Sequence, residues 1–257
     1  MRLAHTPTAA TVVIAACGML AAVFLIRRKR ALKAALSAPD GTACKRGMCA
    51  VPKAPASGGG SGCVMLVPQT FSKAFQLEYS IHRLSRLLRT DVELVFRPDL
   101  EDAYQSDPRG AKAGVSKEAF LQEHLLAVPT WQPSSQDLSE ISDVVNQERR
   151  ALLKNFDAWA AAVRPRLSRW SDCSCPMEGN ARFGTSTSTI YNELEGLTQL
   201  LRYDAIPIGC CGIVLHPKWH RRAYPVTFFT TAPLDELVRV LGEVEVVNGD
   251  SRGSTAP

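Results

Sequence analysis

The sequence predicts an α/β fold: a three-layer, Rossmann-like domain with a mainly parallel sheet, preceded by a single N-terminal transmembrane helix and a flexible linker. Three observations predict it. Residues 8–26 are apolar and uncharged, residues 57–62 are only serine and glycine, and from Cys63 onward short apolar runs alternate with longer amphipathic ones. Short continuous apolar runs are typical of strands that are buried on both faces of a parallel sheet.

The first predicted element is a transmembrane helix from Thr8 to Ile26. A run of this length, without a charge, crosses a hydrocarbon core about 30 Å thick. Four basic residues follow directly: Arg27, Arg28, Lys29 and Arg30. By the positive-inside rule this cluster places the C-terminal side in the cytosol. A cleaved signal peptide is the alternative, but its positive charges precede the apolar core instead of following it.

The chain therefore divides into five predicted segments. They are a short lumenal end at 1–7, the transmembrane helix at 8–26, a basic stop and disordered linker at 27–62, a cytosolic α/β domain at 63–247 and a disordered tail at 248–257. The 257 residues are 46% hydrophobic and 21% charged, which is ordinary for a protein that contains one globular domain.

The distribution of charge argues against nucleic-acid binding, and the cysteine spacing argues against disulfides and CxxC motifs. The net charge is +5, but the basic excess lies in residues 27–33. The folded part is therefore close to neutral and carries no electrostatic signature of nucleic-acid binding. None of the eight cysteines has CxxC spacing, and in a reducing cytosol they are expected to be buried thiols instead of disulfides.

The domain is predicted to begin with a βαβ unit. Residues 63–67 are apolar and predict a strand, apolar residues at helical spacing from Phe71 to Leu88 predict a helix, and residues 92–96 predict a second strand. Residues 97–115 are charged, contain proline and glycine, and predict a loop.

The middle of the chain is predicted to be mainly helical. A short helix is expected at 116–127, and a longer one is expected to begin after Ser134 or Ser135 and to end before Pro165. The polar stretch 172–189 predicts a surface loop that leads into a helix at 190–201.

Strands and a helix are predicted to alternate at the C-terminal end. Residues 205–215 predict a buried strand that bends at Gly209 or Gly212, and 224–230 predict another strand. A helix at 234–241 and a last strand at 244–247 complete the prediction.

No cofactor site is predicted. The joint after the first strand, residues 68–71, has no glycine, so neither the dinucleotide-binding motif nor the P-loop is present. Residues 184–189 could hold an anion through amides and hydroxyls, although a Ser/Thr capping loop is the simpler interpretation.

Six residues have side chains that zinc accepts: Cys173, Cys175, Cys210, Cys211, His216 and His220. Adjacent cysteines in a strand point to opposite faces, so no metal site is predicted and these thiols are expected in the core. The alternative that stays open is a membrane-tethered thiol- or metal-dependent enzyme built on these residues.

No catalytic residue is predicted either. The carboxylate pairs Glu193 with Glu195 and Asp235 with Glu236 are interpreted as solvated helix faces. Two aromatic residues of the middle region, Trp131 and Trp170, are candidates for a partner interface.

The layout of the chain resembles the peroxin-22 family, the peroxisomal membrane anchors of a ubiquitin-conjugating enzyme. The matching pieces are the apolar run 8–26 with its basic cluster, the opening unit 63–96 and the closing unit 224–247, whereas the middle, 97–180, is longer here. The resemblance implies a non-enzymatic adaptor, single-pass in the peroxisomal membrane, that recruits and stimulates a ubiquitin-conjugating enzyme for recycling of the cargo-import receptor. It also implies no small-molecule substrate. An anchor or assembly factor of the mitochondrial outer membrane is a further alternative.

Overall fold

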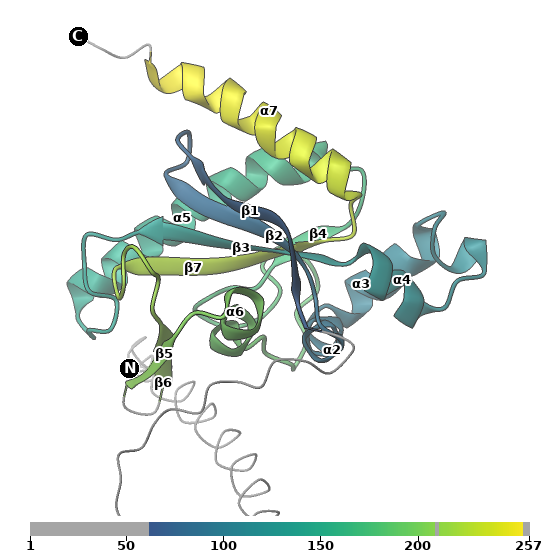
Figure 1. Cartoon of the computed structure of the whole chain (residues 1–257), viewed down its shortest axis with the longest axis horizontal. Helices are drawn as coiled ribbons and strands as arrows, with labels where there is room; N and C mark the ends of the chain where they lie inside the picture. Colours follow the sequence, from purple (N-terminus) through teal and green to yellow (C-terminus); the bar gives the residue numbers. More distant parts are fainter. Residues whose placement is uncertain (1–61, 209–210, 254–257) are drawn as a thin grey trace, which may run out of the picture. The chain divides into compact units, whose positions relative to one another are not determined.

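The computed structural model describes residues 62–208 and 211–253, which fall within one compact unit, Gly59–Pro257. A five-stranded sheet lies at its centre with the order β1-β2-β3-β7-β4, and each neighbouring pair is antiparallel (Figure 1). Its strands are β1 (Val64–Ser72), β2 (Leu77–Arg83), β3 (Leu126–Pro133), β4 (Ser171–Cys173) and β7 (Ala223–Thr230). A separate hairpin pairs β5 (Ala205–Ile208) with β6 (Cys211–Val214).

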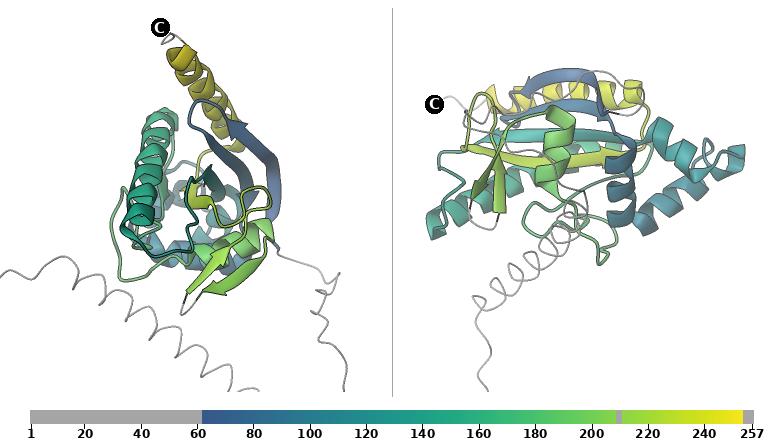
Figure 2. Two further views of the ribbon diagram at one scale, coloured as in Figure 1. Left: turned by 90° about the vertical axis from the view of Figure 1, so that its left-hand side faces the viewer. Right: turned by 60° about the horizontal axis from the view of Figure 1, so that its bottom comes forward.

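Helices cover both faces of the five-stranded sheet (Figures 1 and 2). One core packs the sheet against α5 and α7, and the other packs it against α2, α3, α4 and α6. The helices are α2 (Arg86–Val95), α3 (Arg97–Ser106), α4 (Lys117–His124), α5 (Asp143–Val163), α6 (Glu193–Leu201) and α7 (Leu234–Gly253), with short 3-10 turns η1 (Ala111–Ala113) and η2 (Arg164–Arg166).

The central strands supply side chains to both cores. Val128 and Phe228 face the core under α5 and α7, whereas their neighbours Ala127 and Phe229 face the opposite core. All four are fully buried. Because successive strand residues point to opposite faces, a sheet covered on both sides has continuous apolar strands. This explains why the apolar runs resemble those of a parallel sheet.

The predicted Rossmann-like, mainly parallel sheet is therefore wrong. The predicted βαβ unit is a β-hairpin followed by a helix: β2 lies where a helix is expected, and α2 contains most of the expected strand 92–96. The turn between β1 and β2 contains Gln76 with a φ of 52°, a left-handed conformation that reverses the chain. A hairpin needs only such a turn, whereas a parallel pair needs a long crossover.

Four further segments differ from prediction. The expected loop 97–115 contains α3, and β3 lies where no strand was predicted. The expected last strand 244–247 belongs to α7, and the expected strand 205–215 is the β5–β6 hairpin.

The two long amphipathic helices and the strand before the C-terminal helix are confirmed. The long helix is α5, which begins at an N-cap serine, Ser142, instead of Ser134 or Ser135, and ends before Pro165. The helix expected at 190–201 is α6, and the strand expected at 224–230 is β7.

The predicted membrane span from Thr8 to Ile26 lies outside the described residues, as does its basic cluster, Arg27 to Arg30. Within the part of the chain that the structure describes, no helix is both long and apolar enough to cross a membrane. The fold of that part is an antiparallel sheet between two helical layers.

Candidate functional site

His216 lies at the centre of an ordered polar and aromatic site beside the β5–β6 hairpin. It follows β6, forms an isolated bridge with His220, and is only 2% exposed. Its Nδ1 accepts hydrogen bonds from the backbone N–H groups of Lys218 (3.2 Å) and Trp219 (3.3 Å). The proton of the neutral ring is therefore on Nε2, which lies 3.2 Å from Glu78 Oε1.

Aromatic rings surround this imidazole. Trp219 stacks on it with ring centroids 4.3 Å apart, while Trp131 and Tyr203 lie at 5.1 and 5.7 Å. Phe71 of β1 is 6.4 Å from Trp219 and 40% exposed. We call the three partly exposed rings Phe71, Tyr203 and Trp219 the aromatic face.

Both nitrogens of His216 are engaged, which limits what the imidazole can do. Burial lowers its pKa, although Glu78 opposes the shift, so the neutral ring is favoured at physiological pH. The imidazole thus holds the turn that carries Trp219 and supports the aromatic face from beneath. The chemistry that this site offers is apolar contact with a flat ring system instead of proton transfer.

A second polar cluster lies between β4, β7 and the start of α6. The carboxyl group of Glu193 accepts hydrogen bonds from Thr227 Oγ1 (2.5 Å) and Ser174 Oγ (2.7 Å). Its removal from solvent raises the pKa of Glu193 to about 7. The hydroxyls of Tyr191 and Tyr224 are buried without a hydrogen-bond partner among the described residues.

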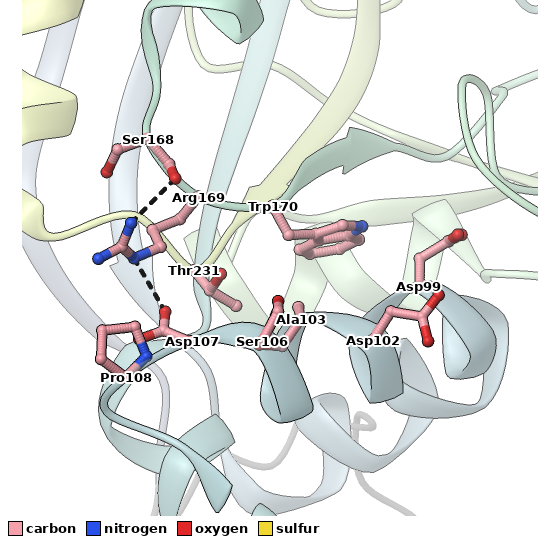
Figure 3. Close-up of a pocket in the computed structure, with 10 residues that line it drawn as sticks. All are labelled: Asp99, Asp102, Ala103, Ser106, Asp107, Pro108, Ser168, Arg169, Trp170 and Thr231. Carbon is pink, nitrogen blue, oxygen red and sulfur yellow. Dashed lines mark hydrogen bonds and ion pairs between the residues drawn. The ribbon is translucent and has the colours of Figure 1, made fainter. Parts of the chain in front are cut away.

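A pocket of about 350 Å³ lies between α3 and the segment that leads into β4 (Figure 3). Asp99 and Asp102 of α3 line one end, and Asp107 and Arg169 line the other. The indole of Trp170 lies between the two ends (Figure 3).

The structure separates the predicted zinc-type residues into two places. Cys173 and Cys175 are buried in the core under α5 and α7, and burial raises the pKa of the Cys173 thiol. His216 and His220 lie beside the β5–β6 hairpin, whose second strand begins at Cys211, and Cys210 is outside the described residues. Within the described ranges, no three His, Cys, Asp or Glu side chains form a metal-binding group.

The predicted anion-binding loop at 184–189 is engaged by the protein's own carboxylates. The N–H of Gly184 donates to Asp172 Oδ2 (2.8 Å), and the N–H of Thr185 donates to Asp99 Oδ2 (2.8 Å). The amides that were considered for an anion therefore have partners already.

Two carboxylates that were interpreted as solvated are structural. Glu193 is the half-buried acid of the second cluster, and Glu236 accepts from the backbone N–H and hydroxyl of Ser168. Of the two candidate interface tryptophans, Trp131 is 2% exposed within the core and Trp170 lines the pocket. No local pattern marks Glu193, because its burial results from Ser174 and Thr227 on other elements.

Comparison with known proteins identifies the family. A profile described as "Methylmalonic aciduria and homocystinuria type D protein" matches residues 67–240. The match runs from within β1 into α7 and includes all of the five-stranded sheet except the first residues of β1. The chain belongs to this family. A short PGF-CTERM motif also matches residues 11–29, outside the described residues.

A relative of the type D family is the chicken (Gallus gallus) protein named "Cobalamin trafficking protein CblD". It is 24% identical over 170 residues, which are 65% of this chain and 50% of the relative. The chain therefore spans about half the length of this curated relative. The relative's name describes a trafficking protein.

The type D family replaces the resemblance to peroxin-22, which is wrong. That resemblance depended on layout, and its opening βαβ unit is a hairpin and a helix. The implied role as adaptor of a ubiquitin-conjugating enzyme, that enzyme as partner and the single-pass peroxisomal membrane location are wrong with it, because each depended on the resemblance. Thr8, Ile26 and the basic cluster Arg27 to Arg30 remain predictions.

Proposed function

We propose that this chain takes part in cobalamin trafficking as a non-enzymatic protein that contacts the corrinoid through the aromatic face. The observation that carries the proposal is the type D family match over residues 67–240, which includes Phe71, Tyr203 and Trp219. The name of the chicken relative supplies the ligand class.

The form of the aromatic face supports contact with a corrin ring. A corrin is a broad, flat macrocycle, and aromatic side chains pack well against the faces of flat ring systems. The pocket beside α3 has a volume of about 350 Å³, at the lower end of the range that suits drug-sized ligands. An open surface is therefore better matched to a corrinoid than that pocket.

Two observations support a role without catalysis. The Cys173 thiol is buried with a raised pKa, which disfavours the nucleophilic thiolate. His216 has both ring nitrogens engaged, by backbone amides and by Glu78, so it is not positioned as a free general base.

Genetic complementation tests the proposed role in cobalamin trafficking. Expression of the full-length chain in cells that lack the CblD relative should lower methylmalonate and homocysteine, the metabolites in the family's description. An unrelated protein of similar size is the control. Failure to lower either metabolite, with the chain expressed and folded, would contradict the proposal.

A binding experiment tests the aromatic face itself. Titration of the full-length chain with hydroxocobalamin, followed by the corrin absorbance bands, should give a Kd that rises about tenfold or more in Trp219→Ala. Phe183→Ala is the matched control, because Phe183 is 37% exposed but lies under Arg164, away from the aromatic face. Equal Kd values for both variants and the unchanged protein would remove the aromatic face from the proposal.

A further inference from the structure

The pocket beside α3 is separate from the aromatic face and has a charge at each end. Asp99 and Asp102 face it from one end, and Asp107 and Arg169 face it from the other (Figure 3). The indole of Trp170 lies between the two ends and makes an edge-to-face contact with Phe96, with ring centroids 5.4 Å apart.

The end at Asp99 and Asp102 is negative. Asp99 already accepts two hydrogen bonds from Thr185. Asp102 is exposed and has no hydrogen bond or ion pair with another described residue. A carboxylate next to an indole ring is an arrangement that attracts an ammonium group, through charge and through the face of the ring.

The opposite end is positive. The Asp107 side chain is 2% exposed and contacts two guanidinium groups, Arg109 Nη2 at 2.6 Å and Arg169 Nε at 3.1 Å. Hydrogen bonding from Arg109 holds the pKa of Asp107 at about 2, so the carboxylate stays ionised. Arg109 is not among the residues that line the pocket, so it helps to neutralise Asp107 from outside while Arg169 is the cation that this end presents to a ligand.

Thr231 supplies an unpartnered donor between the two ends. The residue is fully buried, lines the pocket, and its Oγ1 has no hydrogen-bond partner within the described part of the chain. In Figure 3 its side chain lies between Asp107 and Trp170. A buried hydroxyl without a partner costs about 1–3 kcal/mol, and an acceptor atom of a ligand would remove that cost.

The geometry points to a binding site for a small zwitterion, with its ammonium group beside Asp102 and Trp170 and its carboxylate beside Arg169 and the Thr231 hydroxyl. Asp102 in α3 and its C-cap residue Asp107 are five positions apart. At about 1.5 Å per residue the two charged ends are about 7 Å apart along the helix. The ligand class is therefore an amino acid whose amine and carboxylate are separated by several methylene groups.

Calorimetric titration of the full-length chain with three small molecules that share the same six-carbon chain tests this site. The probes are 6-aminohexanoate, hexylamine and hexanoate. We expect 6-aminohexanoate to bind about tenfold more tightly than either single-charge probe and to weaken as salt is added. Absence of binding, or equal binding of hexylamine and 6-aminohexanoate, would overturn the two-ended site.

Variants separate the site from general charge effects. Thr231→Val and Asp102→Asn should each weaken 6-aminohexanoate binding about fivefold, whereas Glu140→Gln, an exposed acidic residue outside the pocket, should not change it. Thr231→Val should leave the midpoint of thermal unfolding unchanged or higher, because it removes a hydroxyl that has no partner. Unchanged affinity in both pocket variants would refute the proposal, and neither result bears on cobalamin binding.

Discussion

Glu193 and His216 are ionisable side chains whose removal from solvent favours the neutral form of each, against hydrogen-bonding neighbours that favour the charged form. Glu193 accepts from two hydroxyl groups and contacts no cation among the described residues, so its removal from solvent dominates and raises its pKa to about 7. His216 accepts backbone amides at Nδ1, a bond that requires the unprotonated atom. His216 is therefore neutral near physiological pH, whereas Glu193 holds its proton below about pH 7 and ionises as the pH rises through that value.

The raised pKa of Glu193 predicts a loss of stability as pH rises. Between its ordinary value of 4.5 and about 7, the folded protein holds a proton that the unfolded chain has released, so the free energy of unfolding decreases with pH. Glu193→Gln keeps an acceptor for Ser174 and Thr227 but cannot ionise. As the pH rises from 5 to 8, we expect the free energy of unfolding of this variant to increase by about 2 kcal/mol relative to that of the unchanged protein.

Urea unfolding at several pH values measures this effect. The difference between the two proteins should be small near pH 4.5 and should increase through pH 7. Parallel pH dependences for the two proteins would show that Glu193 does not titrate in this range.

The imidazole of His216 predicts a second residue-scale effect. His216→Ala should lower the free energy of unfolding by about 2–3 kcal/mol, because the amides of Lys218 and Trp219 lose their acceptor and Glu78 loses its donor. His216→Asn should recover about 1 kcal/mol, since its side-chain oxygen replaces Nδ1. Chemical denaturation of both variants is the measurement, and equal stabilities would contradict a capping role for Nδ1.

Helices and strands were predicted correctly where the spacing of the apolar residues fitted one type of element, and wrongly where it fitted both a helix and a strand. In α5 the buried residues Val145, Phe156 and Val163 continue one helical stripe over several turns. In β2 the buried residues Leu77 and Ile81 are also four positions apart. This spacing fits one face of a helix, and it also fits one face of a strand, in which every second side chain points the same way. The helical interpretation of 71–88 failed for this reason.

The C-terminal helix makes a contact that local patterns do not disclose. The carboxylate of Glu245 in α7 accepts from Ser72 Oγ and from the backbone N–H groups of Lys73 (2.8 Å) and Ala74 (3.1 Å). It thereby fixes the turn between β1 and β2. Val244 beside it is buried in the same core as Leu237 and Val240, which explains why the helix continues through the expected strand.

Glu245→Ala should therefore cost about 2–3 kcal/mol of unfolding free energy, since three donors lose one acceptor. Glu243→Ala is the matched control, because Glu243 forms an exposed ion pair with Arg239 of the same helix, and such pairs contribute less than about 1 kcal/mol. Equal effects in denaturant unfolding would show that α7 does not hold the hairpin.

At the scale of the whole molecule, the sheet joins two cores that depend on each other. β3 and β7 contribute alternate residues to both, so loss of either helical layer exposes one face of the same strands. Cooperative unfolding of the part that contains the sheet is the consequence.

We expect a fragment of residues 62–257 to fold without residues 1–61. The three apolar clusters that the structure describes lie between Cys63 and Val244, so the fragment contains all of their residues. Circular dichroism and thermal unfolding should give a single cooperative transition with a midpoint within about 5 °C of that of the full-length chain. A fragment without a cooperative transition would show that residues 1–61 are needed for the fold.

The sequence alone determined the amphipathic helices α5 and α6, the apolar strand β7 and the near-neutral folded part, because periodicity, capping and composition are local properties. Tertiary structure decided the direction of every strand pair, the helical state of residues 92–95 and 244–247, and the burial of Glu193. Those outcomes depend on partners far along the chain, such as Ser174 and Thr227 for Glu193. A strand buried on both faces looks the same locally in parallel and antiparallel sheets, and only the pairing of distant segments distinguishes them.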